Sequence, residues 1–280
     1  MKIKLVAIDI DGTLLDSSYR IGEETRRAVA EAIAAGVLIV LVTGRRFAIA
    51  RPIALELNLH TPLISHNGAL TKDIETLEVI DYHPLSAPLA RRAVELARPL
   101  GADVICCYDP HGYGRVVIDT ISADNVKLRR YLDRSPMIIE QVADLRASIN
   151  DDPIQVMSSG PCALMDQFEQ VLADHLDGQV KLLKTAYPAK DMTILDVLTP
   201  ECSKAVALAA VVERSGLSRQ EVMAIGDNYN DLEMLAYAGL GVMMGNADER
   251  LRGLGFPVTA SNDENGVAQA IAEFALGHNQ

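Results

Sequence analysis

The sequence predicts an α/β fold in which both ends of the chain build one parallel-sheet core and the middle forms an inserted α+β domain. Two observations favour this architecture. Apolar runs alternate with helical patterns at both ends of the chain, whereas in the middle pairs of strands are joined by turns and separated by helices. With 280 residues, 49% of them hydrophobic, the chain can bury the cores that such a molecule needs.

The first part of the chain has the pattern of a strand, a helix and a second strand. Residues 3–10 form an almost continuous apolar run, which is typical of a strand buried on both faces. Residues 23–35 show helical periodicity and stop at Gly36, and residues 37–42 form the second apolar run. Such a unit must be parallel and right-handed. A third short strand is expected at residues 63–65.

The pattern changes near residue 82. We expect a helix over residues 89–100, then strands over 104–108 and 115–118 joined by the turn-forming residues 109–114. Hairpins between helices indicate an antiparallel sheet, unlike the parallel beginning. The same pattern recurs with a helix over residues 163–176 and strands over 154–158, 180–184 and 192–197.

The last part of the chain again shows strands that alternate with helices, as the first part does. Helices are expected over residues 203–215, 231–238 and 267–276, alternating with strands over 222–226, 241–244 and 257–259. We therefore assign residues 1–82 and 191–280 to the core and residues 83–190 to the inserted domain.

Charge and composition exclude several kinds of partner. The formal net charge of -12 argues against nucleic acid or an anionic membrane, because both require a basic surface. No apolar stretch approaches the roughly 18 residues of a membrane span, and the apolar run at the N-terminus is too short for a signal peptide. The 4 cysteines lack metal-ligand spacing. We expect a cytoplasmic protein with reduced thiols that acts on a small molecule.

Two carboxylates follow the first strand. Asp9 and Asp11 lie two residues apart, so a regular strand would point both to the same face. Close carboxylates repel each other, which favours a shared proton or a cation between them, and Mg²⁺ prefers such oxygen ligands. Gly12 permits a sharp turn and lets backbone amides approach an anion. Taken alone, the pair could equally cap the strand and begin a turn.

Three further groups of polar residues stand at a strand end or a helix start. Asp227 and Asp231 follow a late strand and, four residues apart at a helix entry, should lie close together. Thr43 and Gly44 follow the second strand and can hold phosphate oxygens, and Lys204 begins a helix. Singly, Asp231 could be a helix cap and Lys204 a surface residue. Together these residues indicate a binding site, because ligands bind at the carboxyl ends of parallel strands.

In this order, the groups D-x-D-G-T, T-G, Lys and G-D-x-x-N-D resemble the signature of the haloacid dehalogenase superfamily of phosphatases and phosphotransferases. Over nearly its whole length the chain is similar to the Cof-type sugar-phosphate phosphatases, including Asn67-Gly68-Ala69 and Gly245-Asn246-Ala247. It departs from them at Ala205, where the group usually has glycine. The resemblance implies a Rossmann-like, three-layer α/β/α core with an inserted α+β cap domain.

The resemblance also implies roles for individual residues. Asp9 would be the nucleophile and form an aspartyl-phosphate, and Asp11 would be the general acid and base. Mg²⁺ would be held by Asp9, the main-chain carbonyl of Asp11 and Asp227, with Asp231 orienting its waters. Arg45 and Asn67 are candidates for contact with the substrate or for the wall of the site. The residues expected to bind the phosphoryl group are Ile10, Thr43, Gly44, Lys204 and Asn230.

The predicted function is that of a Mg²⁺-dependent phosphatase for small organic phosphate monoesters, with sugar phosphates as the expected class. A phosphomutase or another phosphotransferase that shares the aspartyl-phosphate is an alternative. A non-enzymatic regulatory module of the receiver type is a second alternative, but such modules are shorter, lack a cap and carry the phosphate on a later strand. The sequence leaves the individual substrate and the oligomeric state open.

Overall fold

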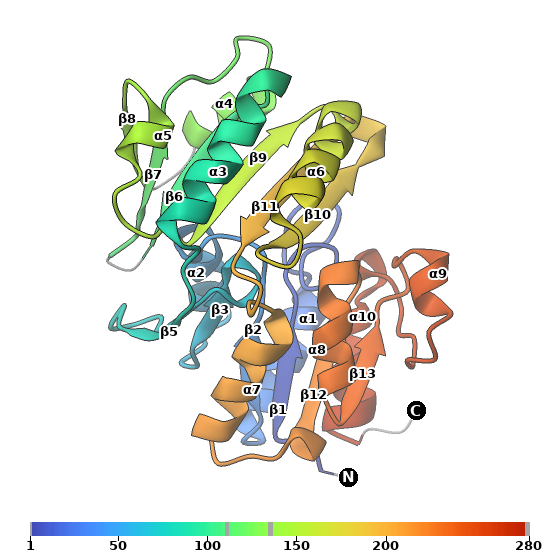
Figure 1. Ribbon diagram of the computed structural model, residues 1–280. Coiled ribbons are helices and arrows are strands. Elements are labelled where there is room, and N and C mark those ends of the chain that lie inside the picture. The colour runs from blue at the N-terminus through green and yellow to red at the C-terminus, as the bar shows by residue number, and fades with distance from the viewer. Residues whose placement is uncertain (1, 110–111, 134–136, 278–280) are drawn as a thin grey trace. The chain divides into compact units, whose positions relative to one another are not determined.

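The computed structural model describes residues 2–109, 112–133 and 137–277 (Figure 1). The chain divides into two compact units, one formed by Met1–Asp81 with Ser203–Gln280 and the other by Tyr82–Cys202. Among the described residues, no helix is both long and apolar enough to cross a membrane.

The sheet of the first unit is parallel and contains strands from both ends of the chain. Strand β1 (Leu5–Ile8) lies between β2 (Leu38–Leu41) and β12 (Val222–Gly226), and β13 (Leu240–Met243) pairs with β12. All four residues of β1 are buried, which explains the unbroken apolar run. The structure confirms the predicted parallel core, with β1 and β12 side by side (Figure 1).

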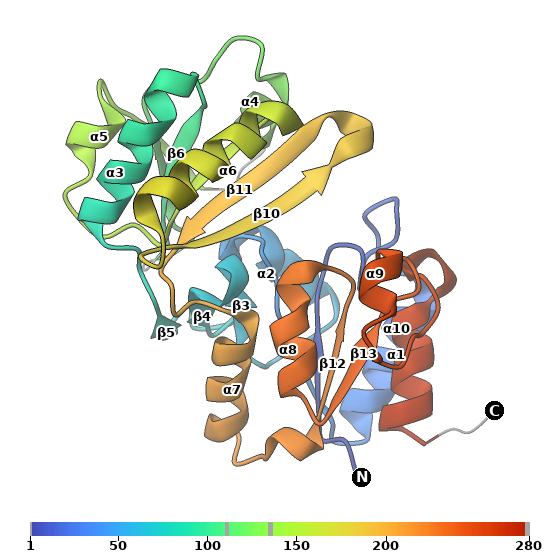
Figure 2. The ribbon, with the colours of Figure 1, turned by 45° about the vertical axis from the view of Figure 1, so that its right-hand side comes forward.

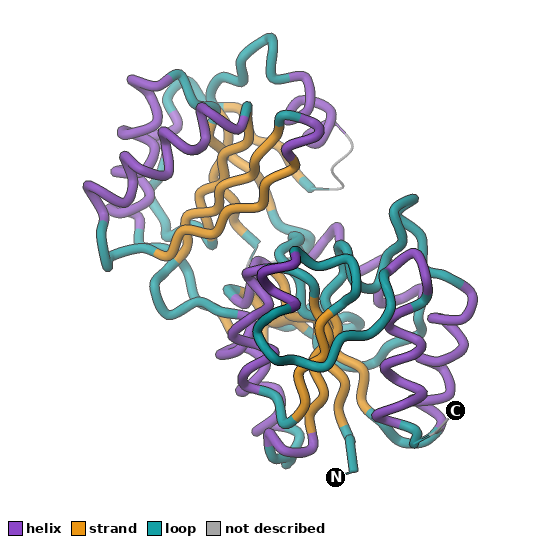
Figure 3. The backbone as a smooth tube through the Cα atoms, turned by 90° about the vertical axis from the view of Figure 1, so that its right-hand side faces the viewer, coloured by secondary structure: helices purple, strands orange, loops and turns teal. Residues whose placement is uncertain are grey.

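Helices cover both faces of this sheet (Figures 2 and 3). Helices α7 (Lys204–Arg214) and α8 (Leu232–Tyr237) pack against the face that carries Leu5 and Ala7. Helices α1 (Glu23–Ala34) and α10 (Gly266–Ala270) lie together on the other face, as Figure 2 shows. The predicted three-layer α/β/α arrangement is therefore confirmed.

Part of the predicted C-terminal region is wrong in detail. The expected strand at residues 257–259 is reduced to a bridge between Val258 and Met243. The expected helix at residues 267–276 divides into α10 and a π-helical turn at Ile271–Ala275. A short helix, α9 (Glu249–Arg252), precedes them and was not predicted.

A small second sheet follows helix α2 (Phe47–Glu56) in the first unit. Its strands are β3 (Leu63–Ser65), β4 (Leu70–Lys72) and β5 (Val79–Tyr82), in that order. Val42 bridges Ile64 in parallel, so β3 continues the core sheet beyond β2. The strand predicted at residues 63–65 is confirmed, but helix α2 was not predicted, because Pro52 inside it breaks the helical pattern.

The second unit is built on a largely antiparallel sheet, as predicted. Helices α3 (Ala87–Ala97) and α6 (Cys162–Leu176) pack against it through one hydrophobic core. The short helices α4 (Val126–Asp133) and α5 (Leu145–Ser148) complete the unit. The strand order is β10 (Lys181–Tyr187), β11 (Met192–Leu198), β9 (Gln155–Gly160), β6 (Val104–Tyr108), β7 (Arg115–Ile118) and β8 (Ile138–Gln141), with β8 parallel to β7.

The second unit extends past the boundary predicted at residue 190. Strand β11 lies between β10 and β9 and pairs with both in antiparallel register. The residues up to Cys202 therefore belong to the inserted unit, whereas the prediction assigned them to the core. The strand itself was expected, but its pairing partners depend on the register and not on its apolar pattern.

Candidate active site

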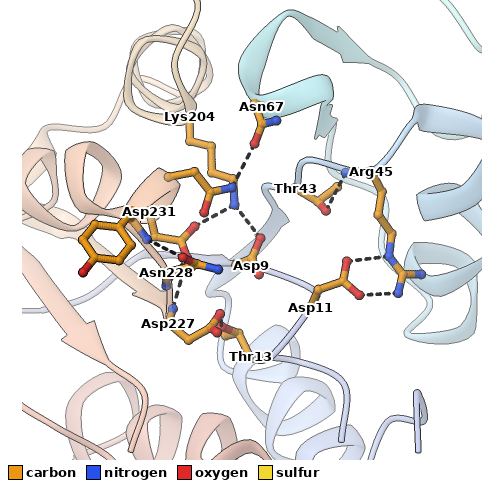
Figure 4. Close-up of polar contacts among 12 residues, drawn as sticks. Asp9, Asp11, Thr13, Thr43, Arg45, Asn67, Lys204, Asp227, Asn228 and Asp231 are labelled. Atoms are coloured by element: carbon orange, nitrogen blue, oxygen red, sulfur yellow. Dashed lines mark hydrogen bonds and ion pairs between the residues drawn. The ribbon is translucent and has the colours of Figure 1, made fainter. Parts of the chain in front are cut away.

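Three carboxylates meet at the carboxyl ends of β1 and β12. Asp9 directly follows β1 and its backbone N–H donates to the carbonyl of Ile225 over 3.0 Å. Asp227 and Asp231 follow β12. Each of the three carboxylates brings an oxygen within 4.8 Å of the others. Because β1 and β12 are parallel neighbours, their following residues reach the same edge of the sheet (Figure 4).

Lys204 joins two of these carboxylates. Its Nζ lies 2.5 Å from Asp9 Oδ1 and 2.6 Å from Asp231 Oδ1, and its side chain is only 1% exposed. Lys204 opens helix α7, which Ser203 caps by accepting a hydrogen bond from the Val206 N–H. Burial lowers the pKa of Lys204, but the charges of Asp231 and Asp9 outweigh that effect and raise it. Lys204 is thus a buried, charged part of the site.

Asp231 is held by protein donors through both of its oxygens. Besides Lys204 on Oδ1, its Oδ2 accepts from the backbone N–H groups of Asp227 and Asn228 over 3.1 and 3.0 Å. The side chain is fully buried. Asp231 therefore fixes the turn that presents Asp227, which suits an orienting role better than a direct contact with a metal ion.

Asp227 rests against the turn that follows Asp9. The Thr13 hydroxyl donates to Asp227 Oδ1 over 3.0 Å, and a Cβ placed at Gly12 would lie 2.4 Å from Asp227 Oδ2. The Gly12 carbonyl in turn accepts from the Asn246 side chain over 2.8 Å. Thr13 and Asn246 had no predicted role, although Thr13 belongs to the D-x-D-G-T group and Asn246 to Gly245-Asn246-Ala247. They connect the turn after β1 to the C-terminal part of the core.

The electrostatics of this cluster favour a bound cation. Burial raises the pKa of Asp9 well above its ordinary value, against the effect of Lys204, and the charges of Asp231 and Asp227 raise it further. Burial and the charge of Asp231 raise the pKa of Asp227 to about 7. Lys204 contacts Asp9 and Asp231 but not Asp227, and a divalent cation would offset the remaining negative charge of the cluster. Oxygen-only donors suit Mg²⁺, so the residues present fit the predicted ion.

Asp11 turns away from the cluster and pairs with Arg45 (Figure 4). Arg45 Nε donates to Asp11 Oδ2 over 2.7 Å and Nη2 donates to Oδ1 over 2.5 Å, a bidentate ion pair. Strand β1 ends at Ile8, so the regular alternation that would place Asp9 and Asp11 on one face does not reach Asp11. Arg45, predicted as a candidate substrate contact, pairs in this structure with the residue predicted as the acid and base.

The residues predicted to bind phosphate lie around the same strand ends. Thr43 is buried and its hydroxyl accepts from the Arg45 N–H over 3.1 Å. Asn230 Nδ2 donates to Asn67 Oδ1 over 2.9 Å, and a Cβ placed at Gly44 would lie 2.9 Å from that same Asn67 oxygen. Ile10 directly follows Asp9 in the chain, and its side chain is fully buried.

Fold and site together define a class of protein, a hydrolase with a parallel α/β core and a buried Asp–Lys–Asp cluster at the strand ends. The family model of the haloacid dehalogenase-like hydrolases matches residues 6–271. The chain therefore belongs to this family, and within it to the Cof-type group that its motifs indicated.

Several relatives of the chain are named as phosphatases. It is 30% identical over 274 residues to 5-amino-6-(5-phospho-D-ribitylamino)uracil phosphatase YcsE of Bacillus subtilis, covering 98% of this chain and 96% of that protein. It is 27% identical to pyridoxal phosphate phosphatase YbhA of Escherichia coli, covering 97% and 98% of the two chains. The solved subclass IIB sugar phosphatase BT4131 matches with a TM-score of 0.80 and 25% identity, covering 98% and 99%. The protein is a phosphatase.

Proposed function

We propose that this phosphatase hydrolyses small organic phosphate monoesters, sugar phosphates foremost, through an aspartyl-phosphate on Asp9 and with Mg²⁺ as cofactor. The observation that carries the proposal is the buried Lys204, which bridges Asp9 and Asp231 where the core strands end. The names of the relatives add support for the substrate class, because YbhA is a pyridoxal phosphate phosphatase and BT4131 a sugar phosphatase.

In the first half-reaction Asp9 attacks the phosphorus atom. Lys204 binds Asp9 Oδ1, so the other carboxylate oxygen forms the new bond to phosphorus while the bond to the ester oxygen breaks. Asp11 gives its proton to the departing oxygen. The Thr43 hydroxyl, the backbone N–H groups of Ile10 and Gly44, the Asn230 amide and Lys204 stabilise the charge on the phosphoryl oxygens.

In the second half-reaction water attacks the phosphorus of the aspartyl-phosphate. Asp11 takes a proton from this water, the bond between phosphorus and the Asp9 oxygen breaks, and inorganic phosphate leaves. One group thus serves first as acid and then as base. For each transfer one oxygen of Asp11 must leave the bidentate pair with Arg45 and carry the proton, while the other oxygen keeps its bond to Arg45 and holds the side chain in place.

Asp9, Asp227 and the main-chain carbonyl of Asp11 would hold Mg²⁺, and Asp231 would orient its waters. When bound, the ion supplies positive charge to the phosphoryl oxygens and lowers the repulsion that a carboxylate nucleophile meets. The cap that determines substrate specificity, predicted over residues 83–190, corresponds in this proposal to the unit Tyr82–Cys202. We also propose that the protein is cytoplasmic.

A phosphate-release screen tests the proposed function. Sugar phosphates, nucleotides and pyridoxal phosphate are incubated with the protein and Mg²⁺, with and without EDTA, and the Asp9→Asn protein serves as the blank. We expect Mg²⁺-dependent release of phosphate from sugar phosphates. An isomerised sugar phosphate without released phosphate would instead identify a mutase and overturn the proposal.

A further inference from the structure

The turn between β3 and β4 has an uncommon backbone. His66, Asn67 and Gly68 all have positive φ, at 51°, 55° and 99°. The left-handed region costs an L-residue roughly 1–2 kcal/mol, so two consecutive non-glycine residues persist there only when their surroundings require it. His66 and Asn67 are also buried, at 0% and 3% exposure. The turn therefore needs a structural or functional reason.

Backbone hydrogen bonds connect this turn to the loop after β2. The His66 N–H donates to the Arg45 carbonyl over 2.9 Å, and the Asn67 N–H donates to the Thr43 carbonyl over 3.0 Å. Both acceptors belong to the loop that carries the phosphate-binding Thr43 and Gly44. The turn and this loop thus keep a fixed spacing.

The same turn touches the start of helix α7. A Cβ placed at Gly68 would lie 2.2 Å from the Ser203 carbonyl oxygen and 3.0 Å from the Lys204 backbone nitrogen. Only glycine permits this approach together with the φ of 99°. The turn is therefore in contact with the backbone that presents Lys204.

The Asn67 side chain connects the turn between β3 and β4 to Asn230. Its Oδ1 accepts from Asn230 Nδ2 over 2.9 Å, and its amide group packs against Gly44. One N–H of the Asn230 amide is used in this bond, which fixes the amide plane and lets the second N–H serve the phosphoryl group.

We propose that Asn67 is a positioning residue that orients Asn230 toward the transferring phosphoryl group, and that the left-handed turn is retained to bring Asn67 to that place. The inference rests on the proposed function, in which Asn230 binds phosphate. It replaces the earlier expectation of a direct contact between Asn67 and substrate.

The test removes the acceptor and keeps the backbone. Glycine accepts a positive φ, so Asn67→Gly deletes the side chain without opposing the turn. With p-nitrophenyl phosphate and saturating Mg²⁺, we expect kcat/KM to fall about tenfold and the inhibition constant of inorganic phosphate to rise by a similar factor. The matched control is Asn58→Gly, also at positive φ (53°) but exposed at the end of α2, which should leave both constants unchanged.

A double-mutant cycle separates orientation from general damage. In the Asn67→Gly background, adding Asn230→Ala should cost little, because the oriented amide is already lost. In an Asn67→Asp background, which keeps an acceptor oxygen, Asn230→Ala should still cost nearly as much as in the wild type. If Asn67→Gly does not fold, the cycle with Asn67→Ala decides the question, because alanine also lacks the acceptor oxygen but keeps the Cβ; there too Asn230→Ala should cost little.

Two results would overturn the inference. One is wild-type constants for Asn67→Gly, and the other is losses for Asn67→Gly and Asn230→Ala that simply multiply in the double variant. Failure of the proposed function would look different, since the wild-type protein itself would then release no phosphate.

Discussion

At the scale of single residues, Lys204 balances the charge of the site. The chain carries a formal net charge of -12, and a phosphorylated substrate requires local positive charge. Lys204 supplies it from a fully buried position between Asp9 and Asp231. Removal of one partner from a buried ion pair is costly because the remaining charges stay buried and uncompensated.

Lys204→Met should therefore destabilise the metal-free protein by about 3–5 kcal/mol and also abolish turnover. Urea denaturation in EDTA measures the first effect. Lys184→Met is the control, because Lys184 pairs with Asp166 and Glu169 from a side chain that is 32% exposed, where a lysine contributes at most about 1 kcal/mol. Equal losses of unfolding free energy in the two variants would show that the buried Lys204 bridge stabilises the protein no more than an exposed ion pair does.

Asp11→Asn separates the two half-reactions. The amide cannot take a proton from the attacking water, so hydrolysis of the aspartyl-phosphate should slow by about a hundredfold or more. Substrates with a good leaving group, such as p-nitrophenyl phosphate, should then give a burst followed by slow turnover. An unchanged steady-state rate would remove Asp11 from its proposed role.

At the scale of elements, the turn after β1 depends on one close approach. Gly12 has a φ of 80°, and a Cβ there would collide with the Asp227 carboxylate. This contact sets the distance between the residues that follow β1 and those that follow β12. Thr13 and Asn246 stabilise the same turn through their hydrogen bonds.

Gly12→Ala should displace Asp227 and weaken the response to Mg²⁺, in addition to the backbone strain of about 1 kcal/mol or more. Gly36→Ala is a matched control, since Gly36 has a φ of 82° but a Cβ there meets nothing within 4 Å. Both variants should lose stability in thermal unfolding, and only Gly12→Ala should need more Mg²⁺ for half-maximal activity. The same Mg²⁺ requirement in both would contradict the role of the Gly12 contact.

At the scale of the whole molecule, the acidic cluster links stability to pH and to metal. The pKa of Asp227 is raised from 3.8 to about 7, mainly by burial, so between these values the folded protein binds a proton that the unfolded chain releases. A raised carboxyl pKa means stability that is present at low pH and lost as pH rises through the folded value. Mg²⁺ binds the folded protein and should reverse this loss.

We therefore expect the unfolding free energy in EDTA to fall, relative to that of Asp227→Asn, as pH rises from 3.8 to about 7. The expected change is on the order of 1–3 kcal/mol. Urea titrations of both proteins across this range, with and without Mg²⁺, measure it. A difference that does not vary with pH would show that Asp227 is ionised throughout.

The sequence predicts those features of the fold that follow from local hydrophobic patterns better than those that depend on strand register or backbone irregularities. Apolar runs predicted the core strands because a buried parallel strand needs them, and the convergence of Asp9 and Asp227 follows from parallel strand ends. Helix α2 was not predicted because Pro52 interrupts its helical pattern. The C-terminal boundary of the inserted unit was not predicted because the composition of a strand does not determine its register or its partners.

Side-chain direction at the site was the least predictable feature. The pairing of Asp11 with Arg45 and of Asn67 with Asn230 depends on backbone that leaves regular geometry, with positive φ at Gly12 and Asn67. The spacing of Asp9 and Asp11 predicts neighbouring side chains only if the strand stays regular, so it placed Asp11 beside Asp9.

The central claim is that Asp9 carries the phosphoryl group. The most direct measurement is rapid acid quenching of the protein during turnover of a sugar phosphate with Mg²⁺, followed by mass spectrometry of its peptides. We expect one added phosphoryl group on the peptide that contains Asp9, more of it in Asp11→Asn and none in Asp9→Asn, whose turnover should fall by at least about a thousandfold. Steady release of phosphate without that labelled peptide, or from Asp9→Asn at the wild-type rate, would contradict it.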